Sequence, residues 1–324
     1  MLRTLLGLAL LYAVLVMPTA EAAPIAQWER EGWKTDFSRT IVDLDEVRSG
    51  GPPRDGIPSI DDPQFVPVSE VSDLQATEPV IALEIDGDAR AYPLSVMTFH
   101  EIVNDRFGER PILVTYCPLC NAAIVFDARV KGEAASFGTT GKLRRSDLVM
   151  YDRATDSWWQ QFTGEGIAGV HAGERLKMLP SRLASWAEFR EAHPDGRVLV
   201  PNDPNMRPYG TNPYAGYDTA ARPFLYDGAL PDDIDPMARV VVVRRGEGAP
   251  LVVSLARLRE EPFEADGLRI AWRAGQASAL DDRRIARGRD VGGVVVTEDG
   301  APVVHDVTFA FVAHAFHPEA PILR

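Results

Sequence analysis

Two cysteines lie three residues apart in the segment VTYCPLC, and they are the only two in the chain of 324 residues. In an extended strand, Cys117 and Cys120 would lie about 10 Å apart, too far for their sulfur atoms to meet. Pro118 favours a four-residue turn instead, because its restricted φ suits the second position of such a turn. The sequence therefore predicts that both sulfur atoms point to one place.

Three kinds of chemistry are compatible with this turn. A disulfide within it, or a pair of buried thiols, would be structural, and the short closed loop would add little stability. A redox pair needs an acidified thiolate; C-P-x-C occurs before a helix in thioredoxin-like proteins, whereas NAAIVFDARVKGE alternates here like a strand. A metal ion could use both sulfur atoms, and thiolates suit copper or zinc. The residue types leave these three readings open.

A metal ion held by two thiolates needs further ligands, and histidine is the expected type. Among six histidines we prefer His100, because SVMTFHEIVNDRFG (95–108) has apolar residues spaced for one helical face. That predicted helix leads directly into the cysteine strand. The predicted metal ligands are Cys117, Cys120 and His100; a half-buried histidine with no ligand role is the alternative for His100.

A second polar and aromatic group lies in MYDRATDSWWQQF (150–162). A strand here would turn the adjacent tryptophans to opposite faces, so that one enters the core while the other lines a different surface. The segment predicts either a packed hairpin with a solvated turn or one wall of a small-molecule pocket. The candidate ligand-binding residues are Tyr151, Asp152, Arg153, Trp158, Trp159 and Gln160.

The first 22 residues have the pattern of a secretory signal peptide: an early positive charge, a short apolar run and an Ala-Glu-Ala motif. Cleavage is predicted after Ala22, which would make the protein periplasmic or secreted. No later stretch is long and apolar enough to span a membrane. An oxidising compartment favours paired or metal-bound thiols. The net charge of -13 argues against nucleic acid as a partner.

A weak internal repeat organises the rest of the chain. VIALEIDGDARAYPLSVMT (80–98) and VVVVRRGEGAPLVVSLARL (240–258) share a strand, a glycine turn, a second strand and a helix start. The second copy has WRAGQAS where the first has YCPLCNA, so chemistry is expected in the first copy. We expect a mainly β fold of two degenerate repeats packed together with a few short helices, at the margin of α+β. The predicted parts are a signal peptide (1–22), an extended lead-in (23–77), the first repeat (78–200), an irregular connector (201–237) and the second repeat (238–324).

Five segments together resemble family 3179 of the domains of unknown function: HEIVND, VTYCPLC, FGTTGKL, SDLVMYDRATDSWWQQ and GERL. The resemblance covers roughly residues 60–323 and brings no established reaction. It implies that some relatives carry threonine at the position of Cys120, which favours a role for Cys117 alone. It also implies that the family signature includes His100, Cys117, Asp152, Arg153 and either Trp158 or Trp159.

The leading hypothesis is an exported, soluble protein that binds a soft metal ion, copper or zinc, or a small ligand in a pocket centred on Cys117. A rival hypothesis is a periplasmic thiol–disulfide oxidoreductase that uses Cys117 and Cys120 as a dithiol. A third is a non-catalytic structural or interaction module with inert cysteines. No Ser-His-Asp order, paired-carboxylate motif or HExxH motif is present to support a hydrolase.

Overall fold

The computed structural model describes residues 22–246 and 248–324, so the predicted signal peptide (1–22) lies almost entirely outside the described residues. The chain divides into two compact units, Met1–Lys34 and Thr35–Arg324. In the described part of the first unit, the regular element is helix α1 (Ala22–Arg30). None of the helices in the described ranges has the length and hydropathy of a membrane-crossing segment.

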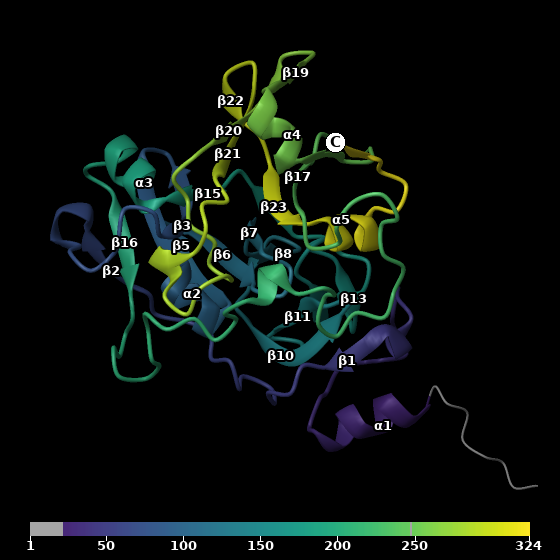
Figure 1. Cartoon of the computed structure of the whole chain (residues 1–324). Helices are drawn as coiled ribbons and strands as arrows, with labels where there is room; N and C mark the ends of the chain where they lie inside the picture. Colours follow the sequence, from purple (N-terminus) through teal and green to yellow (C-terminus); the bar gives the residue numbers. More distant parts are fainter. Residues whose placement is uncertain (1–21, 247) are drawn as a thin grey trace, which may run out of the picture. The chain divides into compact units, whose positions relative to one another are not determined.

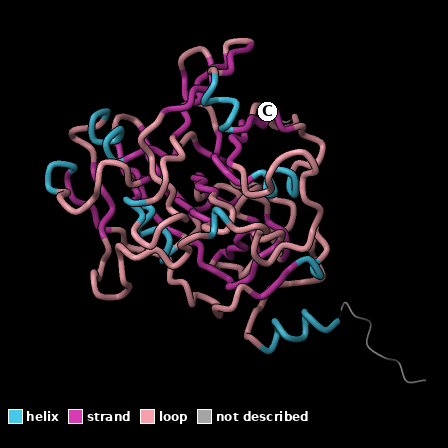
Figure 2. The backbone as a smooth tube through the Cα atoms, viewed as in Figure 1, coloured by secondary structure: helices cyan, strands magenta, loops and turns pink. Residues whose placement is uncertain are grey.

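The unit Thr35–Arg324 contains five small sheets that are arranged like the blades of a propeller (Figure 1). Figure 2 shows that strands run through the whole unit and that its helices are short. The mainly β class expected from the sequence is therefore confirmed.

The first sheet consists, in spatial order, of β15 (Arg182–Ser185), β3 (Pro79–Ile85), β4 (Asp88–Pro93), β16 (Arg197–Val200) and β2 (Gln64–Pro67). The predicted hairpin between β3 and β4 is present. Asp86 and Gly87 form its two-residue turn with φ of 52° and 83°, the left-handed conformations that such turns require. Helix α3 (Trp186–Ala192) begins at a capping box between Ser185 and Glu188.

The second sheet consists of β14 (Lys177–Leu179), β7 (Ala122–Asp127), β6 (Arg110–Cys117) and β5 (Ile102–Phe107). All six residues of β7 are buried, as are seven of the eight in β6. The near-continuous apolar sequence of these strands suits a sheet that is covered on both faces. The cysteine turn joins these two strands at the end of a buried sheet.

The helix predicted over 95–108 is shorter than expected. Helix α2 (Leu94–His100) ends at Glu101, whose φ of 59° is left-handed. The chain then continues as β5, in which Ile102 and Val103 pair with β6. β-Branched residues favour a pleated surface over a helix, and this pairing overrides the helical spacing of the apolar residues. The segment HEIVND is thus mainly a strand.

The third sheet consists of β1 (Val47–Ser49), β10 (Phe137–Arg144), β11 (Asp147–Asp152), β12 (Trp158–Gln160) and β13 (Gly166–Ala168). The hairpin predicted around RATDS is formed by β11 and β12. A further short hairpin pairs β8 (Arg129–Val130) with β9 (Glu133–Ala134). Strands β1 and β2 come from the predicted lead-in, which also holds the 3-10 turns η1 (Leu44–Glu46) and η2 (Val68–Glu70).

The second repeat follows the topology of the first. Its sheet β23-β17-β18-β24 matches β15-β3-β4-β16, because in both an antiparallel hairpin carries an antiparallel strand on one side and a parallel strand on the other. Helices α4 and α5 correspond to α2 and α3. The elements are β17 (Arg239–Val243), β18 (Leu251–Ser254), α4 (Leu255–Glu260), β19 (Phe263–Ala265), β20 (Leu268–Arg273), β21 (Gly293–Glu298), β22 (Ala301–Pro302), β23 (His305–Phe309), α5 (Ala310–Phe316) and β24 (Ile322–Leu323).

One hydrophobic core joins the two repeats. Ile112 and Val125 of the first repeat belong to the same buried cluster as Val240 and Phe309 of the second. The connector (201–237) contains the 3-10 turn η3 (Tyr217–Thr219), and η4 (Ile285–Arg287) lies between β20 and β21. The expected packing of two degenerate repeats against each other is thus observed, and both repeats shape the environment of the cysteine turn.

Candidate metal centre

The turn CPLC brings the two cysteines together. Cys117 is the last residue of β6, and the amide of Cys120 donates to the carbonyl of Cys117 at 3.2 Å. Asn121 completes the reversal with a left-handed φ of 52° before β7 begins. Both cysteines are free thiols, each with less than 3 % of its surface exposed. The convergence expected from Pro118 is present.

A third group, the carboxylate of Asp147, completes the cluster. The two Sγ atoms and a carboxylate oxygen of Asp147 lie within 4.8 Å of one another, and they form the one such trio found among the described residues. Asp147 begins β11 directly after Arg145 and Ser146, which have φ of 54° and 66°. This two-residue turn with two left-handed residues aims the aspartate at the cysteines.

The polar contacts of Asp147 leave one oxygen unused. Its Oδ1 atom accepts from Nε2 of Gln160 at 2.6 Å and from the amide of Phe162 at 2.9 Å. Its Oδ2 atom is buried and has no hydrogen-bond partner among the described residues. Both thiols lie close to the carbonyl oxygen of Ser146, at 3.9 Å for Cys117 and 3.5 Å for Cys120. A buried oxygen without a partner is costly, so this arrangement suits a cation.

Burial governs the protonation of the cluster. It raises the pKa of Cys117 and of Cys120, and the carboxylate of Asp147 adds to both effects. Burial also raises the pKa of Asp147 to about 6, although its hydrogen bonds from Gln160 and Phe162 and the nearby thiol groups act in the opposite direction. Both thiols therefore hold their protons at neutral pH while no cation is bound.

The second repeat holds the cysteine turn in place. The carbonyl of Cys120 accepts from Oγ1 of Thr308 at 2.7 Å and from the amide of Phe309 at 3.3 Å. The side-chain amide of Asn121 donates to the carbonyl of Val307 at 3.0 Å. All three partners lie on β23. The turn is thus fixed from outside its own hairpin.

His100 lies outside the cluster. Its Nδ1 atom lies 2.7 Å from the carbonyl oxygen of Pro58, and its Nε2 atom lies 2.6 Å from the hydroxyl of Tyr209, on which the ring also stacks. Burial lowers the pKa of His100. Of the predicted metal ligands, the structure brings Cys117 and Cys120 together and places Asp147 beside them instead of His100.

A family model described as a protein of unknown function, DUF3179, matches residues 54–320. The chain belongs to the DUF3179 family. The resemblance noted in the sequence is thereby confirmed. No curated protein and no solved structure matches the chain.

In this DUF3179 protein, the hairpin of the family signature is packed and hydrogen-bonded. Nε1 of Trp159 donates to Asp152 at 3.0 Å, and Asp152 also accepts from Thr155. Trp158 is fully buried and meets Phe37 edge to face.

Two further residues of the signature segment contact Asp55 of the lead-in. Tyr151 donates from its hydroxyl to Asp55 at 2.6 Å, and Arg153 reaches the same carboxylate. Gln160 is the one of the six candidate ligand-binding residues that contacts the cluster, through Asp147. The signature therefore supports the site mainly by building the hairpin of β11 and β12, which presents Asp147 and Gln160.

Asp147 was not singled out in the sequence, although it lies in the signature segment SDLVMYD. An aspartate directly after a short turn is commonly a surface residue, so residue type gave no signal. What could have identified it is its place at the start of the apolar run DLVMY, which predicts a buried strand and hence a buried carboxylate. A buried carboxylate needs a partner, and the nearest unassigned groups of matching chemistry were the two thiols.

A pocket of about 420 Å³ lies next to the cluster. Leu119, which stands between the two cysteines, and Leu148, which follows Asp147, both belong to its wall. Glu101 also lines this pocket, and burial raises the pKa of Glu101 to about 8, with a further contribution from the charge of Asp147. The connector covers the other side with residues 213–217 and 224.

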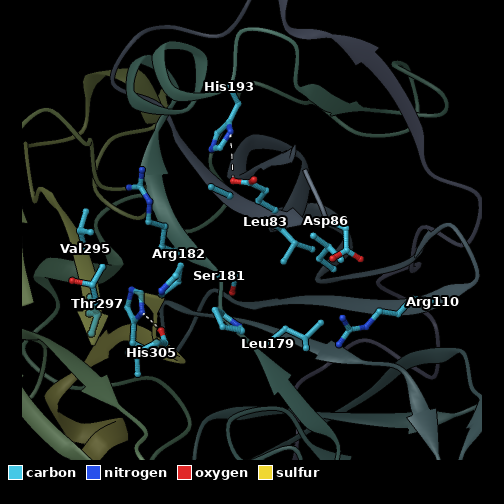
Figure 3. A pocket seen from close by; sticks show the side chains of 17 residues that line it. Leu83, Asp86, Arg110, Leu179, Ser181, Arg182, His193, Val295, Thr297 and His305 are labelled. Carbon is cyan, nitrogen blue, oxygen red and sulfur yellow. Dashed lines mark hydrogen bonds and ion pairs between the residues drawn. The ribbon is translucent and has the colours of Figure 1, made fainter. Parts of the chain in front are cut away.

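Another pocket of about 420 Å³ lies between the two repeats, away from the cysteine turn (Figure 3). Leu83 and Arg182 of the first repeat face Val295 and His305 of the second. His305 contacts the carbonyl of Val303 through Nδ1, and burial lowers its pKa to about 4, so it is neutral at neutral pH. None of the candidate site residues lines this pocket.

Proposed function

We propose that this protein binds a thiophilic metal ion through the two thiolates of Cys117 and Cys120 and the carboxylate of Asp147. The observation that carries the proposal is the convergence of these three groups around a buried carboxylate oxygen that has no partner among the described residues. Two sulfur ligands and one oxygen ligand suit zinc, which binds thiolate and carboxylate together. Copper(I) would use mainly the two thiolates.

A bound cation would stabilise the anionic forms of the two cysteines and of Asp147. A cation replaces the thiol protons and pairs with the carboxylate, so groups that burial keeps protonated become stable as anions. Three protein ligands leave a fourth position of a tetrahedral zinc ion open, as in catalytic rather than structural sites. Gln160 would hold the aspartate in position, in the way that outer hydrogen bonds orient metal ligands.

A dithiol oxidoreductase would use the same pair of cysteines but needs an acidified thiolate. Burial raises the pKa of both thiols here, and the neighbouring Asp147 raises them further. The metal-binding function is therefore the better fit to this electrostatic environment. A thiol count after purification without reductant separates the two functions, because an oxidoreductase would present a reducible disulfide.

The proposal is tested by measuring metal content under reducing conditions. We expect about one zinc per chain, and thiolate-to-metal charge-transfer absorption after cobalt substitution. The variant with both Cys117→Ser and Cys120→Ser should bind no metal, and Asp147→Asn should bind it about tenfold more weakly.

Asp127→Asn is the matched control, since Asp127 also has a buried oxygen without a partner among the described residues but pairs with arginines instead of thiols. It should retain full metal content. Metal that persists in the double serine variant would contradict the proposal. So would a wild-type protein with two free thiols that binds neither zinc nor copper(I), which would favour a non-catalytic module.

We also propose that the protein is exported to the periplasm or secreted. Support comes from the first 22 residues, which combine a basic start, an apolar run and an Ala-Glu-Ala motif. N-terminal sequencing of protein recovered from the extracytoplasmic fraction should begin at Ala23. An uncleaved N-terminus on cytoplasmic protein would contradict export.

A further inference from the structure

The three proposed ligands are sealed from solvent. Cys120 and Asp147 are 0 % exposed, and Cys117 is 2 % exposed. A hydrated cation must therefore lose part of its water shell before it reaches these three side chains. The pocket whose wall contains Leu119 and Leu148 is the opening that lies against the cluster.

Glu101 supplies the one acidic side chain in the wall of this pocket. The residue is 7 % exposed, and its carboxyl group makes no hydrogen bond or ion pair with any described residue. Burying a carboxyl group without a partner is unfavourable. Its backbone is also left-handed, with φ of 59°, a conformation uncommon for residues other than glycine, asparagine and aspartate. Two unfavourable features at one residue indicate a role other than stability.

Glu101 lies within electrostatic range of the cluster. The charge of Asp147 raises the pKa of Glu101, and the charge of Glu101 raises the pKa of Cys117. The other pocket walls are largely apolar, with Ile57 and Phe224 among them. A cation that moves through such an apolar pocket needs an oxygen ligand to replace the water that it loses.

We infer that Glu101 is a transient ligand that receives the metal cation from the pocket and passes it to Cys117, Cys120 and Asp147. This inference rests on the proposed metal-binding function. Glu101 releases its proton to solvent when its oxygen takes up the cation. At the final site the cation exchanges Glu101 oxygen for thiolate sulfur, Glu101 takes up a proton again, and the two thiol protons leave to solvent through the same pocket.

Replacing Glu101 should change the rate at which the metal-free protein takes up the cation, without changing the metal-bound protein. Metal-free protein is mixed rapidly with cobalt(II), and the growth of thiolate-to-cobalt absorption is followed in wild type and in Glu101→Gln. The variant should load about tenfold more slowly, because its amide cannot give up a proton and become an anionic ligand for the cation. The final cobalt content and absorption spectrum should equal those of wild type.

Glu78→Gln is the matched control, because Glu78 is a partly buried glutamate with a raised pKa that does not line the pocket. It should load at the wild-type rate. Equal rates for wild type and Glu101→Gln would overturn the relay while leaving the metal site intact. A changed final spectrum in Glu101→Gln would make Glu101 a permanent ligand and also overturn it. Failure of the wild type to bind cobalt or zinc would instead refute the proposed function itself.

Discussion

The carboxyl group of Asp147 is in conflict with its surroundings whenever no cation is bound. Burial raises its pKa from 3.8 to about 6, so the folded chain holds this proton more tightly than the unfolded chain does. The resulting stability is fully present below pH 4 and is lost as the pH rises through 6. The free energy of unfolding of the metal-free protein should therefore decrease by about 2–3 kcal/mol over this range through Asp147 alone.

Urea unfolding at pH 4.5 and pH 6.5, in the presence of a chelator, measures this contribution. Other carboxylates also titrate, so the informative quantity is the difference between wild type and Asp147→Asn. The variant should lose less stability than wild type between the two pH values, since its amide does not ionise. Identical losses in both proteins would show that Asp147 is not a destabilised buried acid.

At the scale of the residue, the sequence predicted two of the three groups of the cluster. Pro118 restricts the backbone so strongly that the convergence of Cys117 and Cys120 follows from local geometry. Asp147 comes from another hairpin and reaches the thiols only through packing, which no local pattern encodes. His100 was favoured because it is near in sequence, yet its side chain is bound to Pro58 and Tyr209.

At the scale of the element, strand β23 of the second repeat holds the cysteine turn of the first repeat through hydrogen bonds. Thr308 donates its hydroxyl to the carbonyl of Cys120 at 2.7 Å. Thr308→Val removes this hydrogen bond with little change of shape. A hydrogen bond of this kind contributes about 1 kcal/mol, so we expect zinc affinity to fall about fivefold.

Competition with a chromogenic chelator measures that affinity. Thr308→Ser, which keeps the hydroxyl, is the control and should bind zinc nearly as well as wild type. If Thr308→Val and wild type bind equally well, the turn is already rigid within its own hairpin, and the contact from β23 has no positioning role.

The segment after α2 shows why element boundaries were harder to predict than element types. The spacing of apolar residues over 95–108 fits a helix, but the second half pairs as β5 with β6. The choice depends on a partner strand and on a left-handed residue at Glu101, neither of which helical periodicity reports. The hairpin of β3 and β4 was predicted correctly because its Asp-Gly turn is a local signal.

At the scale of the whole molecule, the two repeats share a strand topology, whereas the cysteine turn belongs to the first repeat. Both repeats keep four strands in the same spatial order with one parallel pair, but between β20 and β21 the segment 274–292 stands where the first repeat has the cysteine turn. Repetition of a strand pattern was visible in the sequence because alternation and turn residues persist when side chains diverge. That the two repeats pack together was also predicted, but the residues that share the core, such as Phe309 and Ile112, depend on tertiary packing that no local pattern reports.

Because the proposed ligands come from two hairpins and both repeats hold the cysteine turn, metal binding should stabilise the entire unit Thr35–Arg324 against unfolding. A ligand that binds only the folded state at a free concentration of about 100 times its dissociation constant adds about 2.7 kcal/mol to the free energy of unfolding. Zinc should accordingly raise the thermal midpoint of the whole cooperative transition in wild type, and a chelator should reverse the shift. The double variant with Cys117→Ser and Cys120→Ser should unfold at the same temperature with and without zinc. If zinc raised the thermal midpoint of that variant equally, the stabilisation would come from surface carboxylates and histidines. If zinc shifted only an early, partial transition, the two repeats would not unfold as one cooperative unit.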